Sequence, residues 1–412
     1  MVPYTFTKNA EMFVRATKVI PSGISGNKNP AFAVPGSFPY FAERGEGCRY
    51  WDVDGNEYID FLCGYGPIVL GYNYPAVDEA AERQRKLGSA FNHPTPRSVE
   101  LAEKLVGQVN GADWAALARN GSDVTTYAIQ TAREHTQKRK IIMARGAYHG
   151  SHAWCTPGHG GLIEEDQQQV LQFTWNRADE LEALLVKFEG DIAGVILTPY
   201  HHPAFGDSIM PAEGFWPEVR RLCDKFGVVL ILDDVRAGFR LDLAGSSKYF
   251  GFTPDITTFC KAIANGYSLS AIVGRAAFKN AASNVFFTGT YYTSAVEIAA
   301  ALTCLDEMAR LPSIPHMMKM GARLQQGLVE KARGHGLQVR VSGPPTLPYM
   351  TFANERDFRR MQLFSGECAK RGALLHPHHN WFISYAHKEA DIDRTLAVAD
   401  EVFGMVKRQF GE

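Results

Sequence analysis

The sequence contains no apolar run long enough to span a membrane, so no membrane-embedded segment is expected. Basic residues are not in excess either. Its 43 Lys and Arg face 44 Asp and Glu, a formal net charge of −1, and no basic face points to a nucleic-acid partner. The first residues lack the charged-then-apolar pattern of a signal peptide. These features fit an ordinary soluble globular protein.

Cysteine is scarce and unpaired in its spacing, which argues against a disulfide framework. The seven cysteines are odd in number and scattered along the chain: Cys48, Cys63, Cys155, Cys223, Cys260, Cys304 and Cys368. This usage fits a reducing compartment, and we expect the protein in the cytoplasm. No internal repeat or low-complexity tract is present.

Strand-like and helix-like segments alternate through the middle of the chain. Apolar runs at 140–143, 194–197, 228–232 and 271–274 are interleaved with amphipathic stretches at 178–188 and 216–226. That alternation predicts an α/β fold with a mostly parallel central sheet covered by helices. Outside this region we expect helices at 9–19, 77–86, 98–109 and 294–332, short strands at 38–41, 50–53 and 58–61, and an α+β segment from about 339.

Lys261 and Asp233 carry the main chemical signal. Asp233 ends the apolar run at 228–232, and Lys261 ends another about thirty residues later. A desolvated lysine loses its preference for the ammonium form and becomes nucleophilic toward a carbonyl. An aspartate facing it would keep a pyridine nitrogen protonated, as pyridoxal phosphate (PLP) chemistry requires. On these two residues alone, a surface lysine and a helix-capping aspartate remain an alternative.

Further segments supply groups for a phosphate and a flat ring. Gly121 and Ser122 precede a good helical register, so they fall at a helix N-terminus, which is an anion site by geometry. Tyr148 and His149 follow the strand at 140–143, where a planar cofactor could stack. Thr290 precedes another helix and offers a second hydroxyl for a phosphate. Taken alone, a Gly-Ser helix start is more often just a cap, and the Tyr-His-Gly segment can be an ordinary turn.

In this order the motifs resemble those of the class III (fold type I) PLP-dependent aminotransferases, most closely the glutamate-1-semialdehyde aminomutase branch. The resemblance covers nearly the whole chain. It rests on several separate motifs: Ile20-Pro-Ser-Gly23, Gly47-Cys-Arg-Tyr-Trp-Asp-Val-Asp-Gly-Asn-Glu-Tyr-Ile-Asp-Phe61, Gly64-Tyr-Gly-Pro-Ile-Val-Leu-Gly71, Phe91-Asn-His-Pro-Thr95, Leu232-Asp-Asp-Val-Arg-Ala-Gly-Phe-Arg240, Tyr249-Phe-Gly-Phe-Thr-Pro-Asp255, the Lys261 segment, Ile383-Ser-Tyr-Ala-His387 and Ala390-Asp-Ile-Asp393.

The resemblance implies a fold type I enzyme with a role for each signal residue. It implies a PLP-binding domain over 76–310 and a small domain built from 1–75 and 311–412. It implies an internal aldimine at Lys261, with Asp233 at the pyridine nitrogen. The cofactor contacts it implies are Gly121, Ser122, Tyr148, His149 and Val235, with Tyr148 and Val235 on opposite ring faces. Thr290 of a neighbouring subunit would complete the phosphate site, which implies a homodimer with shared active sites.

The substrate side departs from the family. Thr198 stands where many relatives have a glutamate that pairs with an arginine, and Tyr200 follows it in the expected pocket. The N-terminal arginine of the aminomutase branch is absent, which leaves Lys28 as the only cation there. Arg236 is a second candidate partner for a substrate carboxylate, although a solvent-facing ion pair is the alternative. Tyr65 replaces an aromatic residue that the branch places over its substrate.

Histidine is dense near the C-terminus, at His376, His378 and His379. Together with His201 and His202 these residues raise the question of an imidazole metal site. No acid or cysteine stands at ligand spacing, so we expect a pocket-lining strand and no metal.

The function expected is transfer of an amino group between an amino acid or amine and a carbonyl compound, with PLP as cofactor. A PLP-dependent racemase or epimerase and an aminomutase of the glutamate-1-semialdehyde type remain alternatives. A non-catalytic PLP-binding module is a further one, against which the retained Lys261 and Asp233 argue.

Overall fold

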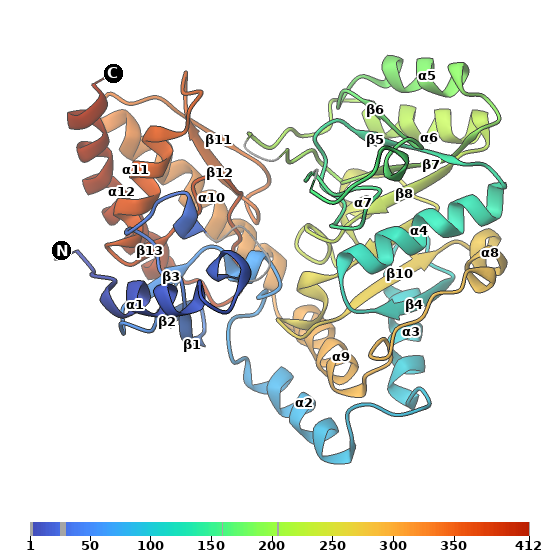
Figure 1. The fold of residues 1–412 in the computed structure, drawn as a ribbon, viewed down its shortest axis with the longest axis horizontal. Coiled ribbons are helices and arrows are strands. Elements are labelled where there is room, and N and C mark those ends of the chain that lie inside the picture. Colours follow the sequence, from blue (N-terminus) through green and yellow to red (C-terminus); the bar gives the residue numbers. More distant parts are fainter. Residues whose placement is uncertain (1–2, 25–29, 159, 204–205, 412) are drawn as a thin grey trace. The chain divides into compact units, whose positions relative to one another are not determined.

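The computed structural model describes residues 3–24, 30–158, 160–203 and 206–411. The chain divides into two compact units (Figure 1). Unit 1 comprises Met1–Tyr74, Phe205–Asp207 and Pro315–Glu412, and unit 2 comprises Pro75–Ala204 and Ser208–Ile314. Each unit has its own sheet and core, and each is described separately below.

Unit 2 is built on a seven-stranded sheet with the order β4-β10-β9-β8-β7-β5-β6. Strands β6, β5, β7, β8 and β9 run parallel, whereas β10 is antiparallel to both β9 and β4. The predicted α/β fold with a mostly parallel sheet is therefore confirmed. The strand bounds are β4 Trp114–Ala118, β5 Lys140–Ala144, β6 Val170–Phe173, β7 Ile192–Leu197, β8 Val229–Asp233, β9 Ile256–Phe259 and β10 Ser270–Gly274.

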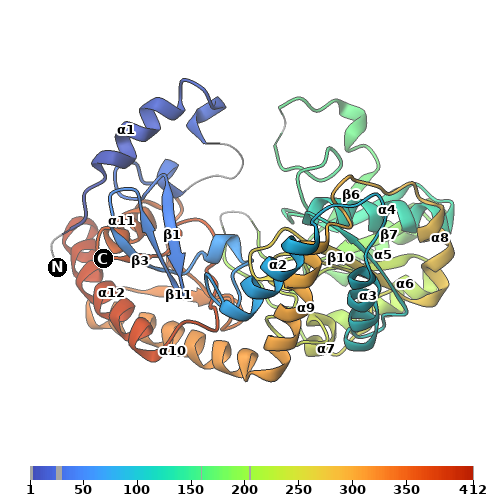
Figure 2. The same ribbon diagram turned by 90° about the horizontal axis from the view of Figure 1, so that it is seen from below.

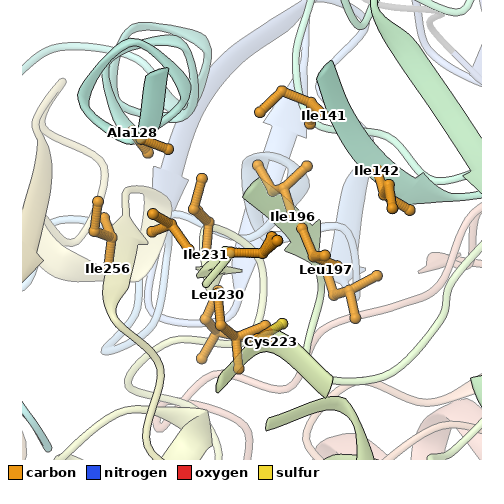
Figure 3. Close-up of a cluster of buried hydrophobic side chains, with 14 of the residues drawn as sticks. Ala128, Ile141, Ile142, Ile196, Leu197, Cys223, Leu230, Ile231 and Ile256 are labelled. Carbon is orange, nitrogen blue, oxygen red and sulfur yellow. The ribbon is translucent and has the colours of Figure 1, made fainter. Parts of the chain in front are cut away.

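The core of unit 2 lies on both faces of this sheet. Every residue of β7 and β8 is buried, which explains their continuous apolar sequences. In Figure 3, Ile231 points toward Ala128 of α4 and Leu230 toward Cys223 of α6, so neighbouring residues of β8 face opposite layers. The helices of this unit are α2 Pro75–Leu87, α3 Pro96–Gln108, α4 Gly121–Thr136, α5 Ala178–Lys187, α6 Phe215–Phe226, α7 Ser246–Phe250, α8 Lys279–Asn284 and α9 Ala295–Arg310, with 3-10 turns η4 Glu164–Asp166, η5 Lys261–Ala264 and η6 Ala276–Phe278.

Unit 1 combines the two ends of the chain. Its four-stranded sheet has the order β1-β2-β3-β13, and the parallel pair β3–β13 joins an N-terminal strand to a C-terminal one. Figure 2 shows β1 and β3 of this sheet near α11 and α12, and α11 packs against both α12 and β13. The bounds are β1 Ala42–Glu46, β2 Arg49–Asp52, β3 Glu57–Asp60, β11 Val339–Ser342, β12 Tyr349–Phe352, β13 Ala373–Leu374, α1 Thr7–Ala16, α10 Ser313–Gly334, α11 Arg359–Ala369 and α12 Glu389–Phe410, with 3-10 turns η1 Pro21–Gly23, η2 Pro30–Phe32 and η3 Cys63–Tyr65.

Three predicted elements are wrong. Residues 38–41 form no strand, because the N–H groups of Tyr40 and Phe41 bond to the side chain of Asn9. The predicted helix at 294–332 is two helices, α9 and α10, separated at Leu311 and Pro312, since proline lacks the N–H that would continue the first helix. The histidine segment is no strand beyond Leu374, because the N–H of His378 turns back to the ring of His376.

Candidate active site

Asp233 and Lys261 lie at the same edge of the sheet in unit 2. Asp233 is the last residue of β8, and Lys261 follows the parallel strand β9 by two residues. Asp233 is paired with Thr258 of β9 in the sheet register. Because the carboxyl ends of parallel strands meet at one edge, the order of the strands brings these two residues into electrostatic interaction.

The environment of Lys261 favours a neutral amine. Burial lowers the pKa of Lys261 to about 8, and the positive charge of Arg236 adds to this effect. The backbone at Lys261 has a φ of 48°, a left-handed conformation that is uncommon for a residue with a side chain. An amine with a pKa near 8 is neutral often enough at physiological pH to attack a carbonyl or accept a proton.

Asp233 is held in place by two hydrogen-bonding contacts. The side chain of His149 lies with Nδ1 2.7 Å from one carboxylate oxygen, and the backbone N–H of Val235 donates to the other at 3.1 Å. Asp233 and His149 are only 4% and 1% exposed. The Nε2 atom of His149 is buried without a hydrogen-bond partner in the described part of the chain. The carboxylate is thus fixed in a dry environment, where its charge acts strongly.

The first turn of α4 forms a cradle beside Asp233. Asp123 accepts hydrogen bonds from the N–H groups of Arg119 and Asn120, which fixes the start of the helix. Ser122 Oγ accepts a hydrogen bond from the N–H of Ser151 at 3.0 Å, so its own proton is available to another acceptor. A Cβ at position 121 would come within 2.9 Å of Val235, which explains the glycine there. The cradle therefore offers helix N–H groups and a hydroxyl to an anion.

The loop after β5 joins this cradle to the carboxylate. Thr125 Oγ1 donates to the backbone oxygen of His149 at 2.8 Å. Gly150 has a φ of +130°, and a Cβ there would stand 2.5 Å from Ser122 Oγ. Sequence reasoning did not single out Ser151 or Thr125, although both stand directly beside residues that it did. Their hydrogen bonds tie His149 to α4.

Two other predicted cofactor residues occupy different surroundings. Tyr148 is 41% exposed and interacts electrostatically with Arg236 and Asp233. Thr290 is exposed in the loop between α8 and α9. No hydrogen bond within the described ranges joins Thr290 to the cradle.

The predicted substrate residues of unit 2, Thr198, Tyr200 and Arg236, follow the ends of β7 and β8. Thr198 follows β7 and donates to the backbone oxygen of Tyr200 at 2.8 Å. Tyr200 is fully buried, and its hydroxyl has no hydrogen-bond partner in the residues described. Arg236 interacts electrostatically with Tyr200, Asp233 and Tyr148. Thus Arg236 lies within electrostatic reach of both Tyr200 and Asp233.

The histidines after β7 are neutral at physiological pH. Burial lowers the pKa of His201 to about 4, and it lowers that of His202 well below the ordinary range, with Arg236 as the next cause. Both ring nitrogens of His202 are buried without a hydrogen-bond partner among the described residues. Next to this segment, burial raises the pKa of Asp234 to about 7, although Ser246 donates two hydrogen bonds to it. These pKa shifts could not be predicted from the local sequence, because burial is a tertiary property.

Two predicted substrate residues belong elsewhere. Tyr65 lies in unit 1, where its ring meets those of His376 and His379 edge to face. Lys28 lies outside the described residues.

Within the described residues, no group of three or more His, Cys, Asp or Glu side chains is placed to hold a metal ion. No helix in the same ranges is both long enough and apolar enough to cross a membrane.

The family model, the similar proteins and a similar solved structure all indicate the same family. Residues 32–344 match the Aminotransferase class-III family. An aminopentol aminotransferase of Sphingopyxis macrogoltabida is 39% identical over 404 residues, covering 98% of this chain and 96% of that protein. A 3-aminobutyryl-CoA aminotransferase of Cloacimonas acidaminovorans is 34% identical, covering 97% and 98%. The structure of the PLP internal aldimine form of the FumI protein of Sphingopyxis sp. MTA144 superimposes with a TM-score of 0.96 at 39% identity, covering 98% of each chain.

The comparisons confirm the family, but they do not confirm the predicted placement in the aminomutase branch. A glutamate-1-semialdehyde 2,1-aminomutase of Syntrophobacter fumaroxidans is 32% identical over 424 residues, covering 96% of this chain and 97% of that protein. This identity is lower than that to the two aminotransferases. The chain belongs to the class III aminotransferases, and it is a PLP-dependent aminotransferase of fold type I.

The residues at the sheet edge fit PLP. The N–H groups of α4 and the Ser122 hydroxyl suit a phosphate, the buried carboxylate of Asp233 suits a pyridine nitrogen, and the low-pKa amine of Lys261 suits an aldehyde. These groups come from separate segments that the sheet and the loop after β5 hold at one edge.

Proposed function

We propose that Lys261 is the lysine that binds PLP covalently in this aminotransferase and that Asp233 holds the proton of its ring nitrogen. In this proposal the segment from 76 to 310 is the cofactor-binding domain. The observation that carries it is the placement of a buried carboxylate and a low-pKa lysine after neighbouring parallel strands. Bound PLP supplies a protonated pyridine ring that draws electrons from the bonds of the substrate's amine-bearing carbon.

The proton transfer is assigned to Lys261. Its amine, neutral above a pKa of about 8, accepts at Nζ the proton that leaves the amine-bearing carbon of the substrate. Arg236 supports this role, since its charge disfavours an ammonium at Lys261. Nζ of Lys261 then donates this proton again to complete the transfer.

His149 is assigned the orientation of Asp233. The 2.7 Å contact between His149 Nδ1 and the carboxylate fixes which oxygen faces the cofactor. The N–H of Val235 holds the second oxygen. A carboxylate oriented in this way keeps a ring nitrogen protonated better than a mobile one, because no reorganisation is needed during the reaction.

The phosphate is assigned to Gly121 and Ser122, with Tyr148 and Val235 on the two faces of the ring. We further propose a homodimer in which Thr290 of the partner subunit completes the phosphate site. The exposure of Thr290 and its lack of a hydrogen bond to α4 within the described chain support this arrangement. The cytoplasm is the proposed location, because the cysteines are free thiols.

Arg236 is the proposed partner for a substrate carboxylate in unit 2, with Thr198 and Tyr200 beside it. Lys28 and Tyr65 are retained as substrate contacts from the sequence alone. The similarity to an aminopentol aminotransferase and to a 3-aminobutyryl-CoA aminotransferase supports an amine or amino compound as donor.

Aminomutase activity of the glutamate-1-semialdehyde type is the second candidate, supported by the 32% identity to such an enzyme. The test is a panel of amino donors mixed with the purified holoenzyme. Amino transfer predicts that a donor converts the cofactor's aldehyde absorption to that of its amine form, with release of a separate carbonyl product. Conversion of glutamate-1-semialdehyde without any released carbonyl product would favour the aminomutase, and a cofactor spectrum unchanged by every donor would contradict both.

A further inference from the structure

A cavity of about 340 Å³ lies in unit 2, at the edge of the sheet opposite to Asp233 and Lys261. Its lining includes Val229, the first residue of β8, whereas Asp233 is the last residue of the same strand. The lining also includes Asp255, which precedes β9, and residues at the carboxyl ends of α4 and α6. A cavity of this volume can hold a small ligand, and its position separates it from the residues assigned to amino transfer.

The two carboxylates of the lining already face cations of the chain. Asp255 is buried and accepts hydrogen bonds from Arg220 Nη1 at 2.9 Å and from Arg275 Nη1 at 3.0 Å. It also accepts one from the N–H of Leu230 at 2.8 Å. Asp224 Oδ1 lies 2.7 Å from Arg220 Nη2. Both carboxylates therefore have counter-charges, and a further cation would gain little from them.

The helix ends at this edge have partners for carbonyl groups as well. Lys138 Nζ donates to the backbone oxygens of Phe226 and Gly227 at 3.3 and 3.1 Å, where α6 ends. At the end of α4, Thr136 Oγ1 donates to the backbone oxygen of Ala132 at 2.7 Å. Carbonyl groups at a helix end carry partial negative charge, and these contacts offset it. A ligand that brings only donors would therefore find few partners here.

Hydrogen-bond donors, in contrast, remain. An ammonium group has three N–H bonds, and Lys138 uses two of them on the carbonyl groups of α6. Arg220 Nε is buried without a hydrogen-bond partner in the part of the chain that the structure describes. When Arg275 is counted, three cations face two carboxylates at this edge. A ligand with one negative charge would balance the third cation.

One wall of the cavity is apolar and aromatic. Phe278 is buried, and its ring centroid lies 4.5 Å from that of His135. Cys223 and Val228 are buried in the same lining. Burial raises the pKa of the Cys223 thiol to about 12, so the thiol stays neutral. A flat hydrocarbon body would find contacts here that a small inorganic anion could not use.

We propose that this cavity binds a small aromatic carboxylate, with its charged end at Lys138 and its ring against Phe278 and His135. An organic cation would be repelled by Lys138 and Arg220. A neutral aromatic molecule would leave the third N–H of Lys138 without a charged acceptor. The site goes beyond amino transfer, because it involves neither Lys261 nor the cofactor.

The test compares 4-fluorobenzoate with 4-fluorobenzamide, which have nearly the same shape and differ in charge. Fluorine NMR titrations of the holoenzyme at low ionic strength should give a Kd for the carboxylate at least about tenfold lower than for the amide. Equal affinities, or no binding of either probe, would overturn the proposal. A preference that disappears in Arg236→Ala would overturn it too, because the carboxylate would then bind on the substrate side.

Two variants locate the preference. Lys138→Gln keeps a donor for the carbonyl groups of α6 but removes the charge, so it should bind both probes equally. The matched control is Lys225→Gln, because Lys225 is an exposed lysine in the last turn of α6 that lies outside the lining and pairs with Glu182. This control should keep the preference.

A third variant covers the case in which Lys138→Gln fails to fold. His135 is exposed at the rim of the cavity, and His135→Ala should weaken both probes several-fold, since it removes part of the aromatic wall. Full preference in a folded Lys138→Gln protein, or unchanged affinities for both probes in His135→Ala, would refute the assignment, whatever the outcome for Lys261.

Discussion

The residues around Asp233 and those that follow β7 lie at one edge of the same sheet, but their polar groups are satisfied differently. Asp233 contacts His149, and Ser122 accepts from Ser151, so the groups that face the proposed cofactor have protein partners, although Nε2 of His149 has none among the described residues. After β7, the hydroxyl of Tyr200 and both ring nitrogens of His202 are buried without partners in the residues described.

The difference fits the proposed division between residues that bind the cofactor and residues that contact the substrate. Groups that hold one fixed cofactor are preorganised by the protein's own hydrogen bonds, because the ligand never changes. Buried polar groups without partners cost free energy in the folded protein, and such groups call for a physical explanation. Beside Arg236, the explanation we favour is contact with a polar part of the substrate.

Removing the lysine should have the largest effect. Lys261→Ala should abolish measurable amino transfer, with roughly 10²–10⁴-fold lost through proton transfer alone. The protein should retain some cofactor through the phosphate contacts. Steady-state kinetics and absorption spectra check this, with the exposed Lys279→Ala as control. Full activity of the Lys261→Ala variant would contradict the proposed mechanism.

Asp233→Asn should have the next largest effect. A neutral amide cannot hold a ring proton as a carboxylate does, and the lost charge-assisted hydrogen bond is worth roughly 1.5–3 kcal/mol before any effect on the reaction itself. The value of kcat should fall by more than about tenfold. An unchanged kcat would show that a different residue holds the ring nitrogen.

Removing the substrate-side cation should have a smaller and selective effect. Arg236→Ala should raise KM for a carboxylated substrate by about thirtyfold, equivalent to roughly 2 kcal/mol, and that for its decarboxylated analogue much less. Lys28→Ala assayed with the same pair tests the second cation, and exposed Arg177→Ala is the control. If KM rises equally for the carboxylated and the decarboxylated substrate in both variants, neither residue binds the substrate carboxylate.

The pH profile sharpens the role of Arg236. Lys261 must be neutral to accept a proton, so kcat should rise with pH and level off above the pKa of about 8. Since the charge of Arg236 lowers this pKa, Arg236→Ala should move the rising limb to higher pH. A limb that moves to lower pH, or does not move, would contradict the electrostatic link.

The smallest effect is expected at Tyr200. Tyr200→Phe removes a buried hydroxyl without a partner and should leave the free energy of unfolding unchanged or raise it by up to about 1 kcal/mol. The matched control is Tyr127→Phe, whose hydroxyl donates to Ala282 at 2.7 Å and whose loss should cost about 0.5–1.5 kcal/mol. Urea unfolding measures both. Equal destabilisation would mean that Tyr200 has a partner in solution.

The sequence predicted the central sheet well, because β7 has no polar side chain and β8 is apolar up to Asp233, which ends it. It failed where a distant side chain replaces the usual backbone partner, as Asn9 does for Tyr40 and Phe41. It also missed the break between α9 and α10, although Pro312 marks it.

Sequence order indicated that Lys261 and Asp233 would meet at the sheet edge, and a desolvated lysine was expected there. The contribution of Arg236 to the pKa of Lys261 and the shifts of His202 and Asp234 were not predicted. They depend on burial and on charges brought together by folding, so local sequence could not supply them.

Reduction of the holoenzyme with borohydride tests the central claim most directly, because it converts a link between PLP and a lysine into a stable amine. Peptide mapping by mass spectrometry should then find the pyridoxyl group on Lys261. The same treatment of Lys261→Ala should leave the protein without a specific label. A label on another lysine of the native enzyme, with Lys261 unmodified, would contradict the account.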